Sequence, residues 1–559
     1  MGIYADNIFD RLSKWAGRGN RPRLRQASVY LLPWVVAGLA LRLWRAALQL
    51  VMFRDETTYA FQIKHLLAGT LFQDGTYYTF PPAFPLLAAP FALVTGDAEL
   101  AGRLISCIMG AATAVPVYLL AREMAGLRTA VVAAAITALC PALMSSAVMS
   151  EPTYAFFVSM SVYLAWKANA GRSWKDYLLF GLCMGAAYLT RPEGFFIFAA
   201  ALFVLAILCI TEKPRTGVWK GMLPLVAAAL FGFFLLAFPY MLQLRSHFGA
   251  WELSGKTRIN LAKVRAVEML IKTGAPDAGD VLDAKAEEVY NNLDRDKKSL
   301  GGNIASNMQD ILARYPGNFE AEVKGLPAIA GYPLVIFALA GTAFILARPG
   351  RTRNVCLPAA AFAPALVIPA VMVMDRVLIP YLPVAIIFAA HGISRVSELI
   401  GERLPAKDYA RGYAVPALAA ILLISAGQLH KSAPNTDIAK ALENDPGYAY
   451  YYELRQTAER LRASIPAGSR IITRNNMFAY YAGGEYLPIP VGNLQDLEEY
   501  AEKERADFLF MGAMEMDMRP DLTRELVDER SDYGGTDKLR LVSFGDNCLL
   551  YKFMHQERT

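Results

Sequence analysis

The chain contains 559 residues, of which 55% are hydrophobic and only 19% are charged, and its net charge is +6. Ordinary soluble domains carry roughly 25% charged residues, so the composition indicates a membrane protein. The small positive charge gives no reason to expect nucleic-acid binding. The six cysteines follow no regular spacing, which argues against a disulfide scaffold and against a cysteine metal cluster.

Long apolar segments fill most of the chain up to residue 430. A helix that crosses a bilayer needs roughly 20 mostly apolar residues, and by this measure the sequence predicts about eleven to thirteen crossings. The predicted helices centre on residues 28–51, 100–121, 128–147, 152–170, 176–190, 195–211, 221–243, 328–348, 355–373, 377–397 and 413–430. The short, proline-rich segment 81–95 is instead expected to lie at the interface or to re-enter the membrane. The basic stretch before residue 28 precedes an apolar run too long for a cleavable signal peptide.

Basic residues recur in alternate connections between the predicted helices. They are Arg122 and Arg128, then Lys167, Arg172 and Lys175, then Lys213, Arg215 and Lys220, then Arg348, Arg351 and Arg353, and finally Arg395, Arg403, Lys407 and Arg411. Short loops rich in Lys and Arg stay in the cytoplasm, so we expect a cytoplasmic N-terminus. The loops 52–99 and 244–327, and everything after residue 431, are then expected on the opposite face of the membrane.

The last part of the chain has a different pattern. Residues 1–431 are predicted to form the transmembrane module, and residues 432–559, which are far more polar, to form a small soluble α/β domain outside the membrane. Runs rich in β-branched and aromatic residues predict strands at 470–473, 507–511 and 549–553, and residues 494–505 are typical of a helix.

Charged side chains gather at the helix ends that face away from the cytoplasm. They are Asp55 and Glu56, Glu151, Arg191 and Glu193, and Asp375 and Arg376. An ionisable group at the bilayer edge is costly unless it is paired or functional, so this common location indicates a site. Each group alone also has a structural explanation, either the capping of a helix N-terminus or a local ion pair.

Carboxylates and cations on one face suit a substrate with hydroxyl and phosphate groups. Arginine binds phosphate bidentately, and a carboxylate can accept the proton of an attacking hydroxyl. The candidate phosphate-binding cations are Arg191, Arg245, Lys256, Arg258 and Arg376. Asp55 and Glu56 could also hold Mg²⁺ or Mn²⁺ beside a phosphate, although adjacent acids are common by chance. The sequence contains no Walker A motif, which argues against ATP-driven transport.

The order of these motifs resembles the GT-C glycosyltransferases. An acidic pair after the first predicted helix is followed by PPAFPLLAAP, MSEPTYAFF, LTRPEG, SGKTR and DRVLIPYLP. This order is most similar to the bacterial branch that includes the protein O-mannosyltransferases and the aminoarabinose transferase of lipid A (glycosyltransferase families 39 and 83). The lysine that the aminoarabinose branch carries near the first-loop prolines is absent, since Phe80, Pro81 and Pro82 stand there.

The resemblance implies an enzyme of the bacterial inner membrane, with its C-terminal domain in the periplasm. It would pass a sugar from a polyprenyl-phosphate donor to a hydroxyl acceptor, a lipid or polysaccharide rather than a protein, with inversion at the anomeric carbon. The resemblance makes Asp55 the catalytic acid–base residue and Glu56 the second acid of the motif. It places the donor phosphate and the rest of the substrate among Arg191, Lys256, Arg258, Arg376, Glu151, Glu193, Asp375 and Tyr381.

Three other functions fit parts of the pattern. A transporter or flippase for lipid-linked glycans would place charges near the bilayer midplane and show repeat symmetry, and neither is visible here. A ligase or polymerase that joins whole glycans would use the same type of site. A structural subunit that binds partners through residues 432–559 would make Asp55 dispensable.

Overall fold

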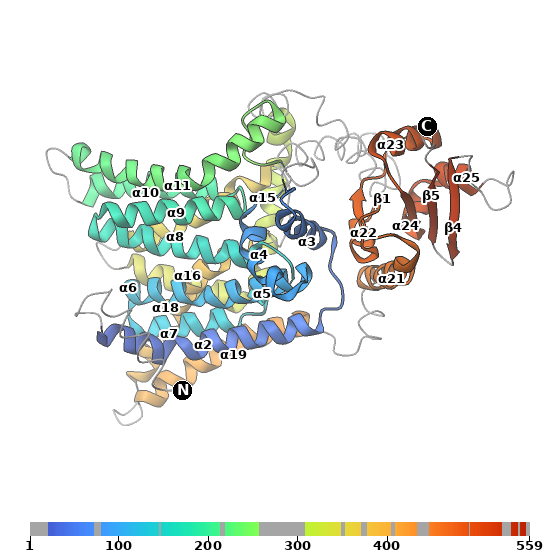
Figure 1. The fold of residues 1–559 in the computed structure, drawn as a ribbon. Helices are drawn as coiled ribbons and strands as arrows, with labels where there is room; N and C mark the ends of the chain where they lie inside the picture. Colours follow the sequence, from blue (N-terminus) through green and yellow to red (C-terminus); the bar gives the residue numbers. More distant parts are fainter. Residues whose placement is uncertain are drawn as a thin grey trace.

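The computed structural model describes residues 21–71, 80–144, 147–212, 218–255, 308–347, 353–370, 377–403, 409–432, 446–490, 492–527, 538–545 and 548–554. Figure 1 shows two parts, a large bundle of helices and a smaller α/β domain at one end of that bundle. The predicted site residues Lys256, Arg258, Asp375 and Arg376 lie outside the described residues, and so does the basic stretch before residue 21.

The bundle is built from long helices joined by short turns. Its α-helices are α2 (Arg21–Leu48), α3 (Arg54–Leu67), α4 (Ala83–Thr95), α5 (Ala98–Ala112), α6 (Ala114–Ala125), α7 (Leu127–Leu139), α8 (Glu151–Gly171), α9 (Trp174–Thr190), α10 (Gly194–Glu212), α11 (Val218–Phe248), α15 (Met308–Ala330), α16 (Tyr332–Leu346), α17 (Arg353–Ala359), α18 (Leu382–Gly401) and α19 (Tyr409–Ser432). Short 3₁₀ helices are η3 (Pro141–Leu143), η4 (Ala360–Leu366), η5 (Ile368–Ala370) and η7 (Ile379–Tyr381).

Each apolar segment that the sequence predicts to be helical overlaps a helix of the bundle, and the protein is a multi-pass membrane protein. In the described part of the chain, six helices are long and apolar enough to cross a membrane, or seven if α15 and α16, which bend by 105° at their junction, form one span. Several further segments are shorter apolar helices, among them α4 and α7. The count of eleven to thirteen crossings therefore stays a prediction.

Prolines explain why one predicted crossing is irregular. The segment 355–373 is divided among α17, η4 and η5, and each of these elements contains a proline: Pro358, Pro364 and Pro369. Proline removes a backbone donor and clashes with the preceding turn of an α-helix. Tighter 3₁₀ turns therefore replace the α-helix in η4 and η5.

The loop predicted at 244–327 is shorter than expected at both ends. α11 continues to Phe248 and ends at Gly249, whose φ of +67° favours glycine. α15 begins at Met308, well inside the predicted loop. Within this loop the polar run DAKAEEVYNNLDRDKKSL, residues 283–300, has a helical sequence pattern, but it lies outside the described part of the chain.

Pairs of glycines let helices of the bundle approach closely. Gly341 of α16 faces the backbone of α18, where a methyl group on it would lie 1.9 Å from the Phe388 carbonyl oxygen. Gly181 of α9 has the same relation to α11, with a distance of 2.0 Å to the Ala229 carbonyl oxygen. Small residues at such crossings maximise van der Waals contact where lipid supplies no hydrophobic driving force.

The α/β domain contains a five-stranded sheet. Its strands β1 (Arg470–Ile472), β2 (Glu485–Leu487), β3 (Phe508–Gly512), β4 (Leu539–Gly545) and β5 (Cys548–Phe553) have the order β2-β1-β3-β5-β4. The strand β1 is parallel to β2 and β3, and β5 is antiparallel to β3 and β4. The helices are α21 (Pro446–Leu461), α22 (Asn476–Ala482), α23 (Leu494–Glu504), α24 (Ala513–Met518) and α25 (Pro520–Val527). The small C-terminal α/β domain is thus confirmed, with β2 and β4 as strands that the pattern missed.

The helix α3 lies between the two parts (Figure 1), packed against α4 and α5 on one side and α22 on the other. The spacing of Tyr59 and Ile63 in the sequence predicts an apolar face that would hold this helix flat on the bilayer surface. Both side chains are instead buried in protein, and so is Phe61 on another face. These side chains share one hydrophobic core with Phe478 of α22 and Phe84 of α4. A flat surface helix was therefore the wrong expectation, because two protein surfaces cover this helix.

The close crossing of α16 and α18 gives a stability prediction. Gly341→Ala should lower the melting temperature of the purified protein, since overpacking a tight contact typically costs about 1–3 kcal/mol. Gly317→Ala is the matched control, because a methyl group there meets no atom within 4 Å. That control should be neutral or stabilising, since alanine favours helices over glycine by about 1 kcal/mol. Equal melting temperatures for the two variants would contradict the packing.

Candidate active site

The centre of the candidate site is Arg191. The helix α9 ends at Thr190, because Pro192 disfavours helical backbone at the residue before it, and Arg191 is extended with φ −150° and ψ 134°. Its guanidinium donates to Glu151 Oε1 at 2.8 Å and to Glu193 Oε1 at 3.1 Å. The local ion pair expected in the TRPEG turn therefore exists, but Arg191 also binds the first residue of α8.

These three charges are largely buried, with side-chain exposures of 17% for Arg191, 8% for Glu151 and 20% for Glu193. One cation faces two carboxylates, so the group carries an excess negative charge. The Oε2 atoms of Glu151 and Glu193 are buried and make no hydrogen bond to the described residues. A buried polar atom without a partner costs about 1–3 kcal/mol, and more when charged. Such atoms are suited to accept hydrogen bonds from the hydroxyl groups of a ligand.

Asp55 reaches the same region through the first turns of α3. Tyr59, one helical turn after Asp55, donates from its hydroxyl to Ser150 Oγ at 2.7 Å, and Ser150 is the N-cap residue of α8. Burial raises the pKa of Tyr59, and among its charged neighbours Glu151 and Asp55 raise the pKa further while Arg191 lowers it. Asp55 itself is half-buried. The structure thus brings Asp55, Glu151 and Arg191 around one tyrosine.

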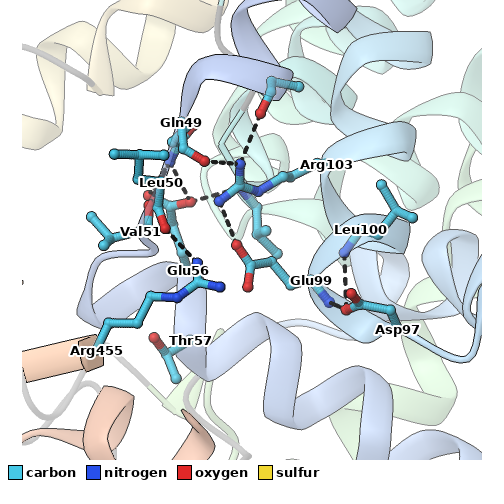
Figure 2. Close-up of polar contacts among 12 residues, drawn as sticks. Gln49, Leu50, Val51, Glu56, Thr57, Asp97, Glu99, Leu100, Arg103 and Arg455 are labelled. Atoms are coloured by element: carbon cyan, nitrogen blue, oxygen red, sulfur yellow. Dashed lines mark hydrogen bonds and ion pairs between the residues drawn. The ribbon is translucent and has the colours of Figure 1, made fainter. Parts of the chain in front are cut away.

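Glu56 is held in a different environment. Its carboxylate accepts from Val148 N at 2.9 Å, from Gln49 Nε2 at 3.2 Å and from Phe53 N at 3.3 Å. The last contact caps the start of α3, because Glu56, at the third position of the helix, accepts from the backbone N–H of the N-cap residue Phe53. Figure 2 shows Glu56 among the polar contacts of the preceding turn. Helix capping, which was the structural explanation for the acidic pair, therefore describes what Glu56 does in this structure.

The ionisation of Glu56 is altered by this location outside the membrane-spanning helices. Burial raises its pKa from 4.5 to about 7, against the opposing effects of the hydrogen bond from Val148 and the charge of Arg103. The carboxylate is 3% exposed, so solvent screens its charge only weakly. Glu56 is consequently a structural carboxylate whose protonation changes near neutral pH.

Tyr381 belongs to η7, which packs against α8. Its ring meets that of Tyr154 edge to face, with ring centroids 6.1 Å apart. Both side chains are fully buried, and their hydroxyl groups interact with each other. Glu193 and Arg191 act electrostatically on Tyr381, as does Glu322 of α15.

Sequence reasoning missed three of these residues. Tyr59 was assigned only to an apolar helix face, although its position four residues after Asp55 places it on the same side of α3. Tyr154 lies one turn into α8, three residues after Glu151. Glu322 is buried, and its Oε2 atom has no hydrogen-bond partner among the described residues. It falls within the predicted loop 244–327, so nothing in the sequence pattern marked it as buried.

Of the other predicted cations, only Arg245 is among the described residues, and it contacts Trp251. The guanidinium of Arg245 lies over the Trp251 ring, with its Cζ 4.7 Å from the centroid, and the Arg245 side chain is exposed. No group of three or more His, Cys, Asp or Glu side chains in the described part of the chain is arranged to hold a metal ion. Mg²⁺ or Mn²⁺ at the first-loop acids therefore stays a prediction without support from this geometry.

The raised pKa of Glu56 predicts how stability depends on pH. Between pH 4.5 and about 7, the folded protein holds a proton that the unfolded chain has lost, so stability falls as pH rises through this window, by up to about 1.4 kcal/mol per pH unit. Glu56→Gln removes this titration. The melting temperature of the parent, relative to that of Glu56→Gln, should decline from pH 4.5 to 7 and then become constant. A constant difference across the whole range would exclude the assignment.

One family model matches part of the chain. Residues 79–241 match the family model described as dolichyl-phosphate-mannose-protein mannosyltransferase. This range includes Glu151, Arg191 and Glu193 and begins after Asp55 and Glu56. A search of curated proteins found no match.

Solved structures of similar fold cover nearly the whole chain. ArnT from Cupriavidus metallidurans bound to undecaprenyl phosphate has a TM-score of 0.56 at 12% identity, over 94% of this chain and 98% of that one. The apo form of that protein gives 0.55 at 12% identity, over 96% and 98%. The oligosaccharyltransferase AglB from Archaeoglobus fulgidus, in complex with an inhibitory peptide and a dolichol-phosphate, gives 0.53 at 15% identity, over 89% and 70%.

The likeness in fold extends over the membrane bundle and the C-terminal domain, and the family match covers the helices that carry Arg191 and its two carboxylates. The chain therefore has the fold of ArnT and AglB, and its residues 79–241 are similar to the dolichyl-phosphate-mannose-protein mannosyltransferases.

Proposed function

We propose that this protein transfers a sugar from a polyprenyl-phosphate donor to a hydroxyl acceptor at the periplasmic face of the bacterial inner membrane. Structures of ArnT with undecaprenyl phosphate and of AglB with a dolichol-phosphate support a lipid-phosphate donor for this fold. The acceptor that we propose is a lipid or polysaccharide hydroxyl. The basic connections carrying Arg122, Lys167 and Arg395 assign their end of the bundle to the cytoplasm.

One observation carries this proposal. The hydrogen bond from Tyr59 to Ser150, 2.7 Å long, joins the helix of Asp55 to the helix that begins with Glu151, which in turn holds Arg191. From this contact we infer that Asp55, the proposed base, lies near the buried Oε2 atoms of Glu151 and Glu193, at the end of the bundle where α3 adjoins the C-terminal domain (Figure 1). A structural subunit would not need this costly combination of groups.

The proposed reaction is a single displacement. Asp55 accepts the proton of the acceptor hydroxyl while the hydroxyl oxygen bonds to the anomeric carbon. The bond from that carbon to the phosphate oxygen breaks, and its electron pair leaves with the lipid phosphate. Attack from the opposite face inverts the anomeric configuration. Because phosphate leaves as an anion, stabilisation of its charge is the larger requirement.

The residues around Asp55 are assigned the binding of the sugar and of the departing phosphate. Both terminal nitrogens of Arg191 bind carboxylates, so we assign to Arg191 the positioning of Glu151 and Glu193, whose unpaired oxygens would accept hydrogen bonds from sugar hydroxyls. Contact with the departing phosphate then falls mainly to the predicted cations Lys256, Arg258 and Arg376. Tyr154 and Tyr381 would donate hydrogen bonds to the polar head group, and Asp375 would pair with Arg376.

The test is transfer from a labelled donor. Purified protein in nanodiscs is incubated with a polyprenyl-phosphate sugar and membrane-extracted acceptor lipids. Asp55→Asn should lower the transfer rate by about 10²–10⁴-fold, the usual contribution of a general base, while its melting temperature stays near that of the parent. Glu402→Gln, an exposed acid near the end of α18, is the matched control and should transfer at the parent rate.

Two results would oppose the proposal. Full transfer by Asp55→Asn would remove the assigned base. A parent protein that neither transfers nor hydrolyses any donor, but moves it across a vesicle membrane, would identify a transporter. Transfer of intact oligosaccharides in preference to single sugars would instead identify a ligase with the same site.

A further inference from the structure

The turn between α2 and α3 is bound from the membrane side by Arg103 of α5. The Arg103 Nη1 atom donates to the carbonyl oxygens of Ala46 at 2.9 Å and Gln49 at 2.5 Å. Its Nη2 atom binds Glu99, one helical turn earlier in α5. Arg103 is 7% exposed, so these hydrogen bonds lie largely out of water. The end of α2 is therefore tied to α5 immediately before Asp55.

The same turn is bound from the other side by the C-terminal domain. Arg455 of α21 donates from Nη1 to the Leu50 carbonyl oxygen, and the Leu50 amide donates to the Tyr448 hydroxyl at 3.1 Å. Both backbone polar groups of Leu50 thus bind side chains from residues about 400 positions later in the chain. Figure 2 shows Arg455 and Arg103 on opposite sides of this turn.

Tyr481 connects these two anchors. The guanidinium of Arg455 lies over the Tyr481 ring, 4.5 Å from its centroid, and the Tyr481 hydroxyl donates to Glu99 Oε2 at 3.0 Å. The contacts form a closed chain from Leu50 through Arg455, Tyr481 and Glu99 to Arg103 and back to Gln49. Glu99 pairs with Arg103, and Glu459 pairs with Arg455, so each cation of this region has a carboxylate partner, without which its burial would be costly.

Further contacts hold α3 itself against the C-terminal domain. Asn476 of α22 donates to Thr58 Oγ1 at 3.0 Å. The Lys64 ammonium lies 3.9 Å from the centroid of the Tyr480 ring, and His65 Nε2 is 2.9 Å from Glu485 Oε2 of β2. The helix that carries Asp55 is thus attached to the sheet domain along its length.

We propose that the C-terminal domain is a clamp that fixes the position of Asp55, with Arg455 and Tyr481 as positioning residues acting on the turn Gln49–Phe53. The catalytic part of this proposal rests on the assignment of Asp55 as the base. Phe53 is the N-cap of α3, so movement of Leu50 is transmitted directly to the first turn of that helix. A displacement of about 1 Å in a reacting group can lower a rate by about 10²-fold.

The experiment uses the full-length protein in nanodiscs and the variant Arg455→Met, which keeps the aliphatic stem but loses the hydrogen bond to Leu50. Amide hydrogen exchange is followed in peptides covering residues 49–58. The clamp predicts exchange at least about tenfold faster than in the parent, the loss expected for a hydrogen-bonded anchor. Arg540→Met, an exposed arginine of β4 in the same domain, is the control and should leave this exchange unchanged.

The kinetic readout separates positioning from general destabilisation. In Arg455→Met, kcat should fall by about 10–100-fold, while KM for the lipid donor stays within about twofold because the donor contacts are intact. Arg455→Lys keeps one donor and should recover part of kcat. Tyr481→Phe removes only the hydroxyl contact to Glu99, so it should raise the exchange rate at residues 49–58 and lower kcat by smaller factors than Arg455→Met does. Amide exchange in β3 should stay at the parent rate in all of these variants.

The outcomes distinguish this proposal from the proposed function. Unchanged exchange at residues 49–58 in Arg455→Met overturns the clamp, whatever the activity. Faster exchange with an unchanged kcat overturns the positioning role. If the parent transfers no sugar, the proposed function fails, and the exchange measurement still decides whether the C-terminal domain holds the turn.

Discussion

The site depends on one guanidinium shared by two buried carboxylates. Arg191 stands where α9 must end, because Pro192 follows it, and from there it reaches Glu151 at the start of α8 and Glu193 in its own turn. Removing the cation would leave two carboxylates unpaired in a region of low exposure, which typically costs about 3–5 kcal/mol for one broken pair. With the cation present, the group still has an excess negative charge and unsatisfied oxygen atoms. This arrangement is costly for stability and suited to binding hydroxyl groups.

The two adjacent acids of the first loop have separate roles because α3 turns them toward different neighbours. Glu56 accepts hydrogen bonds from the backbone amides of Val148 and Phe53, and these contacts occupy both of its carboxylate oxygens. Asp55 and Tyr59 lie toward the group around Arg191. The C-terminal domain covers the outer face of α3 and binds the turn that precedes it (Figure 2).

Much of this organisation follows from local sequence patterns. The apolar segments predict the helices, and the alternation of basic connections predicts that Asp55, Glu151, Arg191 and Tyr381 share one end of the bundle. Short alternating runs predict β1, β3 and β5. The distinction between Asp55 and Glu56 could not be predicted, because it is set by a backbone amide 92 residues away. The contacts of Arg455 and Tyr481 with the first turn likewise span almost the whole chain and leave no local signal. The burial of α3 on two sides was missed because its periodicity is that of a surface helix.

The most direct test of the account is an experimental structure of the protein with a polyprenyl phosphate bound. The account predicts that the phosphate lies at the end of the bundle that adjoins the C-terminal domain, in contact with at least one of Lys256, Arg258 and Arg376, while Asp55 and Tyr59 line the same cavity and the lipid chain leaves between helices of the bundle. Density for the phosphate at the opposite end of the bundle, or in a groove that Asp55 does not line, would contradict it.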